Sequence, residues 1–287
     1  MVPPSLHPIR DEDLPEFCRF LVENLSAERT PEAWAEAFRQ PWCRDKPNNG
    51  FLLRHGGRIV GGIGAIYAQR TVRGRTERFC NITSWCVLDE FRTQSGRLAM
   101  AIVSQPGFHF TDLTPTEVVS KTLQFFKFRP MDERHFVWPN LPWPIARVAG
   151  CRIVADPARI DALLAPEDAK VFRDHRHLPW LGHLAVGQPG AWCHVVWRMT
   201  RLKEVRGAMI LGVSDAERFL RCRWAVGSHL LLRHALPYTR VEARLLPRRP
   251  QPSVELSGYR KKVFRSDTLG EADIGSLYSE LVALDLS

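Results

Sequence analysis

Apolar residues near the start of the chain recur at spacings of three and four, the period of a helix with one buried face. After a short extended segment at 7–10, Asp11 supplies an N-cap for this first helix. Its predicted inward face holds Leu14, Phe17, Cys18, Leu21 and Val22. A second helix is predicted from Pro31, because proline is favoured at the first helical position.

Strand patterns follow the two helices. Residues 51–54, 58–67 and 77–87 are largely apolar and extended in pattern. Glycine-containing turns at 55–57 and at Gly74 separate them, which favours hairpin connections. The sequence therefore predicts a three-stranded antiparallel meander.

Beyond the meander, helix and strand signals alternate. Residues 97–104 predict a helix and 108–111 a short buried strand. Thr116 and Glu117 then belong to a capping box that opens a helix to about Phe126. The order strand, helix, strand, helix predicts parallel pairing, with a ligand crevice at the carboxyl ends of the strands.

A stretch rich in proline and tryptophan, from Trp138 to Pro144, interrupts this periodicity. We interpret residues 138–152 as a packed connector. It separates a first domain over residues 1–137 from a second α/β domain over residues 153–287. A chain of 287 residues is long enough for two small domains.

The second domain repeats the element order of the first. Its pattern predicts a helix over 154–173, strands over 191–199 and 208–213, a long helix from Asp215 to His234, and a strand over 238–245. This recurrence favours two tandem domains of mixed α/β sheet, the second a degenerate copy. The alternative is an unrelated α/β extension that covers the first domain. An amphipathic helix is expected at 276–282, where it docks the C-terminus.

Composition and charge narrow the class of protein. Hydrophobic residues make up 45% of the chain and charged residues 25%, which is enough to bury a sizeable core. We find no apolar run of the roughly 18 residues that a membrane helix needs, and no signal-peptide pattern, so we expect a cytoplasmic protein. The net charge of +9 favours an anionic partner: nucleic acid, coenzyme A phosphates or an acidic carrier protein.

The cysteines and histidines give no metal or disulfide signature. Seven cysteines are spread along the chain without a C-x-x-C pair, which predicts reduced, mostly buried thiols and no disulfide framework. The segment Asp174-His175-Arg176-His177 with His183 does not have the spacing of a zinc site. We expect no metal.

The segment after the third strand carries the most informative motif. It reads Val87-Leu88-Asp89-Glu90-Phe91-Arg92, followed by Thr93-Gln94-Ser95-Gly96-Arg97-Leu98. A helix N-terminus offers backbone N–H groups and a positive dipole end to a pyrophosphate. Small residues let the backbone approach such a ligand closely.

This segment resembles the donor loop of GCN5-related N-acetyltransferases (GNAT), in which a strand ends in an aromatic residue and an arginine before a glycine-rich helix start. The resemblance implies a GNAT-like fold and an acyltransferase that moves an acyl group to the amine of a small molecule. The implied donor is acetyl-CoA, another acyl-CoA or an acyl-carrier-protein thioester. At matching positions the implied donor contacts are Val87, Leu88, Arg92, Gln94, Ser95, Gly96, Arg97, Leu98 and Thr116.

Four positions depart from the family pattern. Ser95 and Arg97 replace small residues of the loop, and Arg97 either crowds the donor or contacts its phosphate. Residues 116–128 resemble the second donor-contacting helix, with Lys127 in place of a glycine. Leu123 stands where many members have the tyrosine that protonates the leaving thiolate, so the usual general acid is missing.

Candidate catalytic residues lie on the strands beside this loop. Glu77 and Asp89 are carboxylates that could act as a base, directly or through water. Asn81 lies on a strand whose polar face we expect at the acceptor cleft. His109 and Asp112 lie at the predicted parallel strand end. We take Glu77, Asn81, Asp89 and His109 as the catalytic set; the alternative for each is a structural role, such as a solvated charge at Asp89 or a packed ring at His109.

Two other classes of function stay open. A non-catalytic module would keep the fold and bind coenzyme A or a carrier protein without turnover, which the altered loop and the missing tyrosine favour. A nucleic-acid-binding protein is disfavoured, because the arginines are scattered and form no basic arm. A covalent mechanism through Cys86 is disfavoured too, because the sequence offers no identifiable histidine partner.

Overall fold

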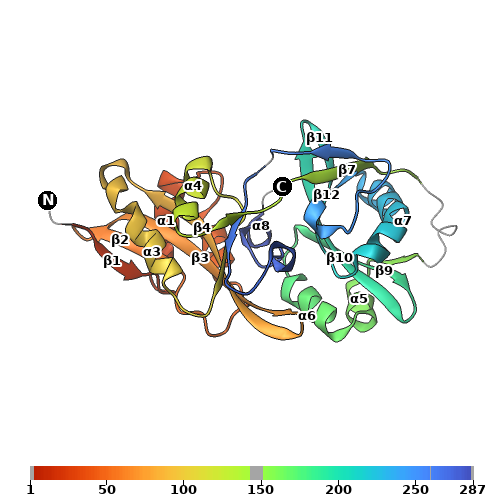
Figure 1. Ribbon diagram of the computed structural model, residues 1–287, viewed down its shortest axis with the longest axis horizontal. Helices are drawn as coiled ribbons and strands as arrows, with labels where there is room; N and C mark the ends of the chain where they lie inside the picture. The colour runs from red at the N-terminus through yellow and green to blue at the C-terminus, as the bar shows by residue number, and fades with distance from the viewer. Residues whose placement is uncertain (1–2, 143–150, 259, 286–287) are drawn as a thin grey trace. The chain divides into compact units, whose positions relative to one another are not determined.

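The chain folds into two units in the computed structural model, which describes residues 3–142, 151–258 and 260–285. Unit 1 comprises Met1–Met131, Arg260–Ile274 and Tyr278–Leu284. Unit 2 comprises Asp132–Tyr259, Gly275–Leu277 and Asp285–Ser287. Figure 1 shows the course of the chain through both.

These bounds differ from the division expected from the sequence. Residues 138 and 139 belong to a strand of unit 2 and not to a connector. Much of the C-terminal tail folds back into unit 1. Residues 143–150 of the expected connector lie outside the described residues.

Unit 1 is built on one seven-stranded sheet in the order β1-β2-β3-β4-β5-β14-β6. Only β4 and β5 pair in parallel; the other neighbours are antiparallel. The elements of this unit are β1 (Ser5–Pro8), α1 (Leu14–Asn24), α2 (Pro31–Phe38), β2 (Gly50–His55), β3 (Arg58–Val72), β4 (Arg75–Val87), the 3₁₀ turn η1 (Asp89–Gln94), α3 (Ser95–Val103), β5 (His109–Asp112), α4 (Glu117–Phe125), β6 (Arg129–Pro130), β14 (Val263–Arg265), η4 (Glu271–Asp273) and α8 (Glu280–Ala283).

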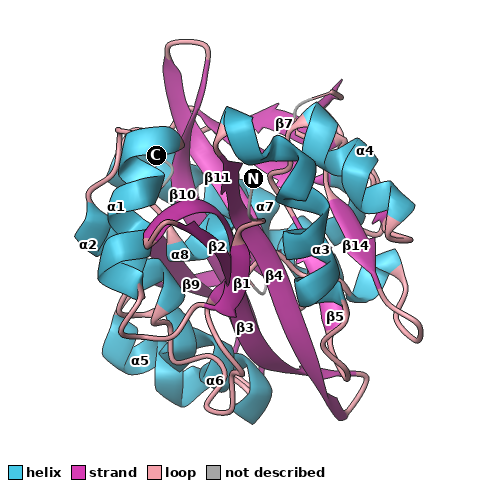
Figure 2. Ribbon diagram, turned by 90° about the vertical axis from the view of Figure 1, so that its left-hand side faces the viewer, coloured by secondary structure: helices cyan, strands magenta, loops and turns pink. Residues whose placement is uncertain are grey.

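Helices cover both faces of this sheet. On one face, Gly62 of β3 leaves room for the ring of Phe17 from α1, because a Cβ at position 62 would lie 2.4 Å from that ring. On the other face, Ile63 packs in a core with Leu98 of α3 and Leu123 of α4. Figure 2 shows α1 and α2 on one side of β1–β4, and α3 and α4 on the other.

The parallel pair β4–β5 separates at one end. Pairing runs only from Phe79 opposite His109 to Asn81 opposite Thr111, although β4 continues for six more residues to Val87. Within that continuation the register of β4 against β3 shifts, so that two residues of β4 oppose one of β3, and Ser84 adopts a φ of 53°. Such a bulge bends a strand and ends its pairing. The end of β4 is therefore left without a neighbour on the side of β5.

Unit 2 is built on a second seven-stranded sheet in the order β13-β7-β12-β11-β10-β9-β8. Its parallel pair is β11–β12. The elements are β7 (His135–Pro139), β8 (Arg152–Val154), α5 (Pro157–Leu163), α6 (Pro166–His175), β9 (Leu181–Gln188), β10 (Ala191–Leu202), β11 (Val205–Val213), α7 (Ala216–His234), β12 (Tyr238–Glu242), η3 (Ala243–Leu245) and β13 (Val254–Leu256).

The two units share one element order. In each, a short strand and two helices precede an antiparallel three-stranded meander, and a helix then leads to a strand parallel to the last strand of the meander. This confirms the predicted tandem arrangement of mixed α/β units. The expected helix over 154–173 is two helices, β9 was not foreseen, and the C-terminal helix is only four residues long.

One disulfide corrects the expectation of reduced thiols. Cys151 at the start of unit 2 is bonded to Cys222 of α7, 71 residues away. The remaining cysteines, Cys18, Cys43, Cys80, Cys86 and Cys193, are free. Spacing alone could not reveal this pair, because the fold brings together two half-cystines that lie far apart in sequence.

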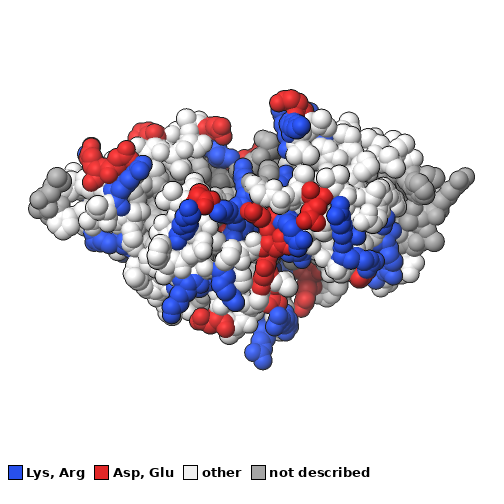
Figure 3. Space-filling view, turned by 45° about the horizontal axis from the view of Figure 1, so that its top comes forward, with Lys and Arg blue, Asp and Glu red and all other residues white. Residues whose placement is uncertain are grey.

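Surface charge is mixed. Figure 3 shows lysine and arginine side chains spread over one face, with acidic side chains among them. Within the described ranges, no helix is long and apolar enough to cross a membrane. The same residues contain no group of His, Cys, Asp or Glu side chains placed to hold a metal ion.

Candidate functional site

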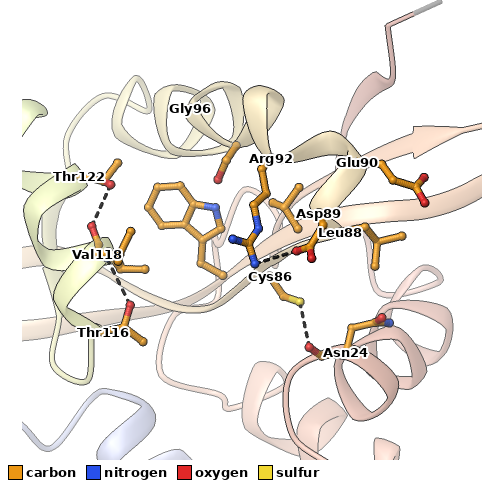
Figure 4. A pocket seen from close by; sticks show the side chains of 14 residues that line it. Asn24, Cys86, Leu88, Asp89, Glu90, Arg92, Gly96, Thr116, Val118 and Thr122 are labelled. Atoms are coloured by element: carbon orange, nitrogen blue, oxygen red, sulfur yellow. Dashed lines mark hydrogen bonds and ion pairs between the residues drawn. The ribbon is translucent and has the colours of Figure 1, made fainter. Parts of the chain in front are cut away.

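A cavity of about 930 Å³ lies in unit 1 at the free end of β4. Figure 4 shows the end of β4 crossing it, with α3 and α4 on one side and the end of α1 on the other. Its walls combine apolar and polar side chains. The lining residues are Asn24, Trp85, Cys86, Val87, Leu88, Asp89, Glu90, Arg92, Ser95, Gly96, Thr116, Val118, Val119 and Thr122.

The N-terminus of α3 forms part of the cavity wall. No side chain caps this helix, and Gly96 in its first turn is exposed, with open space where a Cβ would lie. The N-terminus of a helix carries a partial positive charge and backbone N–H groups that bind anions. The neighbouring α4 differs, because the Thr116 hydroxyl accepts from the Val119 N–H at 3.3 Å and caps it. The wall at Gly96 is thus suited to a phosphate group.

Arg92 is the cationic side chain among the lining residues. Its guanidinium is 2.7 Å from the Asp89 carboxylate, and the two side chains are 73% and 84% exposed. An ion pair this exposed contributes little to stability. Arg92 can therefore exchange Asp89 for a bound phosphate at small cost.

Three other residues of the predicted donor loop do not line the cavity. Arg97 donates to the Pro4 carbonyl at 2.8 Å and to Gln94 Oε1 at 3.1 Å. Leu98 is fully buried in the core. The Arg97 guanidinium is thus held by local contacts, and Arg97 is not among the residues that line the cavity.

The backbone N–H groups of Val87 and Leu88, at the end of β4, point in different directions. The Leu88 N–H donates to the Val60 carbonyl of β3 at 3.0 Å. That amide is therefore already bonded and is not available to polarise a carbonyl. Successive residues of a strand point their N–H groups to opposite edges, so the Val87 N–H faces the side vacated by β5. Val87 is the better-placed backbone donor.

Cys86 lines the cavity but is not activated. Its thiol donates to the Asn24 carbonyl at 3.5 Å, and burial raises the pKa of the thiol above its ordinary value. A protonated thiol is a weak nucleophile. The covalent alternative therefore gains no support.

Two predicted catalytic residues meet each other away from the cavity. His109 Nε2 lies 3.1 Å from Glu77 Oε2, and the Ser266 hydroxyl lies 2.8 Å from His109 Nδ1. The Ser266 oxygen also accepts from the Leu269 N–H at 2.8 Å, which is the role of a turn-forming serine. Glu77 is near the start of β4, whereas the cavity is at its end. The histidine is therefore a packed residue beside the sheet.

Asn81, the fourth catalytic candidate, is also outside the cavity lining. It is fully buried, and its amide donates to the Thr111 hydroxyl at 3.1 Å. Its carbonyl oxygen accepts from the Glu280 N–H at 2.9 Å. Asn81 thus ties β4 to β5 and to the C-terminal segment, where the two strands begin to separate.

Sequence reasoning missed several lining residues. Trp85 and Cys86 adjoin the motif, and their inward position follows from the bulge, which has no sequence signal of its own. Asn24 comes from the end of α1, 61 residues before Trp85. Val118, Val119 and Thr122 follow from the capped start of α4 and could have been found by extending the helix from Thr116.

Solved structures resemble the chain across both units. A GCN5-related N-acetyltransferase from Anabaena variabilis matches with a TM-score of 0.58 at 12% identity, covering 91% of this chain and 72% of that one. A GCN5-related N-acetyltransferase from Kribbella flavida matches with a TM-score of 0.58 at 12% identity, covering 91% and 70%. The chain has the GNAT fold. Eis1 from Mycobacterium abscessus also matches, with a TM-score of 0.53 at 14% identity, covering 91% and 73%.

The likeness confirms the GNAT resemblance of the sequence at the level of fold. No protein-family model matches the sequence, and neither does any curated protein. In the GNAT fold of this chain, the separated parallel strands and the open helix N-terminus meet at one cavity.

Proposed function

We propose that unit 1 is an N-acyltransferase that uses an acyl-CoA donor. The observation that carries this proposal is the cavity at the separated ends of β4 and β5, with the uncapped N-terminus of α3 in its wall. The acyl group would pass from the thioester to the amine of a small molecule held in the same cavity.

The residues present fit such a donor. The first turn of α3 at Gly96 would hold the pyrophosphate, with Arg92 released from Asp89 to pair with it. The free edge of β4 offers the Val87 N–H to the thioester carbonyl, where negative charge develops during attack. A carrier-protein thioester presents the same pantetheine arm and would use the same edge.

The reaction needs few side chains once both substrates are aligned. The amine nitrogen forms a bond to the carbonyl carbon, the C–S bond breaks, the amine loses a proton and the thiolate gains one. Aligning two reactants can supply roughly 7–11 kcal/mol of the barrier. Asp89 and Glu90 line the cavity and are the carboxylates that could relay the amine proton through water.

A second candidate function is binding of coenzyme A or a carrier protein without turnover. The observation that favours it is Leu123, which is fully buried and apolar at the position where the family resemblance implies a tyrosine acid. The two candidates share the donor site and differ only in turnover.

Donor binding and turnover test the proposal in sequence. Calorimetric titration should detect coenzyme A and acetyl-CoA binding, and Arg92→Ala should weaken it about fivefold to twentyfold through loss of one charge-assisted contact. Arg97→Ala is the matched control and should leave affinity unchanged. Absence of binding by the wild-type protein would overturn both candidates. Release of free thiol in the presence of an amine panel then supports the enzyme, and binding without release supports the non-catalytic module.

A further inference from the structure

A carboxyl side chain from the C-terminal segment sits where β4 and β5 part. Glu280, the first residue of α8, is 2% exposed. Its backbone N–H donates to Asn81 Oδ1 of β4 at 2.9 Å. Its Oε1 accepts from the Leu113 N–H, just after β5, at 3.1 Å and from the Thr114 hydroxyl at 2.9 Å. One residue thus bonds to β4 at its last position paired with β5 and to the backbone just after β5.

The Leu113 N–H is a group that a continued ladder would use. Thr111, two residues earlier, directs its carbonyl to the Asn81 side chain of β4. β5 ends at Asp112 and the chain bends at Leu113, so the ladder between β4 and β5 does not extend to the Leu113 N–H. The carboxylate of Glu280 accepts this N–H in place of a β4 carbonyl. It removes the cost of an unpaired buried amide that separation of the strands would otherwise impose.

We propose that Glu280 is a positioning residue that keeps β4 and β5 apart and so keeps the donor cavity open. The cavity begins at Trp85, four residues beyond Asn81 on β4, and at Thr116, three residues beyond Leu113. Without the Glu280 acceptor the separated strands would be left with an unpaired buried amide at Leu113, and the spacing of these two walls would lose its support. The inference rests on the proposed function for its effect on the donor, but not for its effect on the strands.

A second buried carboxyl faces Glu280. Asp112 is 4% exposed, and burial together with the Glu280 charge raises the pKa of Asp112. Burial likewise raises the pKa of Glu280, whose Oε2 has no hydrogen-bond partner. Repulsion between two buried like charges opposes the ionisation of both carboxyls, and it adds to the effect of burial on the pKa of Asp112. The separation of the strands should therefore respond to a rise in pH.

Other charged groups lie around the C-terminal segment that contains Glu280. Arg70 of β3 lies 5.8 Å from an aromatic ring in the same C-terminal segment. α2 packs against α8 and carries Glu32 and Glu36, which are both exposed. The titration of interest thus belongs to Asp112 and Glu280.

Hydrogen exchange of the Leu113 amide tests the positioning role without any ligand. In Glu280→Ala that amide loses its acceptor, and its exchange should accelerate about tenfold or more relative to wild type. In Glu280→Gln the amide oxygen still accepts, so exchange should stay near the wild-type rate. Glu23→Gln, an exposed change on α1, is the matched control. Equal protection of Leu113 in wild type and in Glu280→Ala would overturn the proposal.

Coenzyme A titration across pH supplies the second readout. Wild-type affinity should fall as pH rises and the second carboxyl of the pair ionises, because the repulsion acts on the separated strands. Glu280→Gln removes one charge and should give a flat profile, while Glu280→Ala should bind about tenfold more weakly at every pH. If Glu280→Ala does not fold, Asp112→Asn replaces it and should also flatten the profile. A wild-type slope in both Glu280→Gln and Asp112→Asn contradicts the role of the pair.

Leu113 exchange and coenzyme A titration together distinguish failure of the proposed function from failure of the positioning role. If no variant binds coenzyme A but Leu113 exchange follows the predicted order, the proposed function is wrong and Glu280 still holds the strands. If coenzyme A binds and neither readout responds to Glu280, the proposed function stands and the positioning role is wrong.

Discussion

Helices α3 and α7 occupy the same place in the two units, between the last strand of the meander and the parallel strand, yet their N-termini differ. α3 begins without a side-chain cap, and its first turn borders the cavity. α7 begins with Asp215, whose carboxylate accepts from the Arg218 N–H at 2.8 Å. In unit 1 this helix start follows η1, with the Ser95 N–H bonded to the Arg92 carbonyl, and exposes Gly96 at the cavity, whereas in unit 2 the chain's own carboxylate accepts at the helix start.

The surroundings of α7 differ as well. Gly212, near the end of β11, lies under Leu277, since a Cβ there would be 2.7 Å from that side chain. In unit 2, β12 is followed by the short 3₁₀ turn η3, whereas in unit 1 β5 is followed by the longer helix α4. Unit 2 thus keeps the element order of the GNAT fold. Its own side chains, Asp215 and Leu277, contact the elements that correspond to the cavity wall of unit 1. This difference supports the proposal that the donor site lies in unit 1.

The largest expected difference between the units is their response to acid. His183 Nδ1 lies 3.1 Å from His194 Nε2 in unit 2, with both rings buried. Burial, with smaller contributions from neighbouring histidines, lowers the pKa of His183 to about 4 and that of His194 to about 3, from 6.5. Below pH 6.5 the unfolded chain binds protons that the folded rings do not. Stability is therefore complete above pH 6.5 and declines by about 1.4 kcal/mol per pH unit for each ring as pH falls toward 4.

Hydrogen exchange corrected for its intrinsic pH dependence measures this decline. Amides of β9 and β10 should lose protection between pH 6.5 and pH 4.5, while those of β4 and β5 should not. His194→Gln should reduce the slope, and exposed His7→Gln should not change it. Parallel loss of protection in both units would contradict the assignment of the effect to these histidines.

A charge at the open helix start should have the next largest effect. Gly96 is exposed and has nothing within 4 Å of a Cβ, so Gly96→Glu should preserve the fold. Its carboxylate would occupy and repel the phosphate site, and coenzyme A affinity should fall by about 100-fold, or roughly 2.7 kcal/mol. Thermal unfolding and calorimetric titration on the same sample separate the two effects. Unchanged affinity in a folded Gly96→Glu variant would place the donor elsewhere.

The smallest effect is expected from the capped helix. Asp215→Ala removes the N-cap of α7 and should destabilise unit 2 by about 1 kcal/mol. Coenzyme A affinity should be unchanged, because the cap is not part of the cavity wall. Denaturant unfolding and titration provide the two values. A new coenzyme A site in this variant would show that the cap alone distinguishes the units.

Local signals in the sequence were sufficient for the order of helices and strands from β1 to α4. Thr116 and Asp215 cap their helices as predicted, and the alternation after Gly74 marks the strand that ends at the cavity. These features depend on neighbours within a few residues, where residue type and local geometry are directly linked.

Contacts between segments far apart in the sequence could not be predicted. β14 and β6 are three and two residues long, too short to show a period, yet they complete the sheet of unit 1. Glu280 reaches Asn81 from 199 positions away, and an acidic residue in an apolar tail gives no sign of being buried. Glu77 and His109 contact each other, but neither lines the cavity. A strand pattern does not indicate which end of the strand faces a ligand.

The stoichiometry of coenzyme A binding tests the central claim most directly. Calorimetric titration of the full chain should give one site per chain, abolished by Gly96→Glu and retained in Asp215→Ala. Two sites per chain, or one site that survives Gly96→Glu, would contradict the account of an open unit 1 and a structural unit 2.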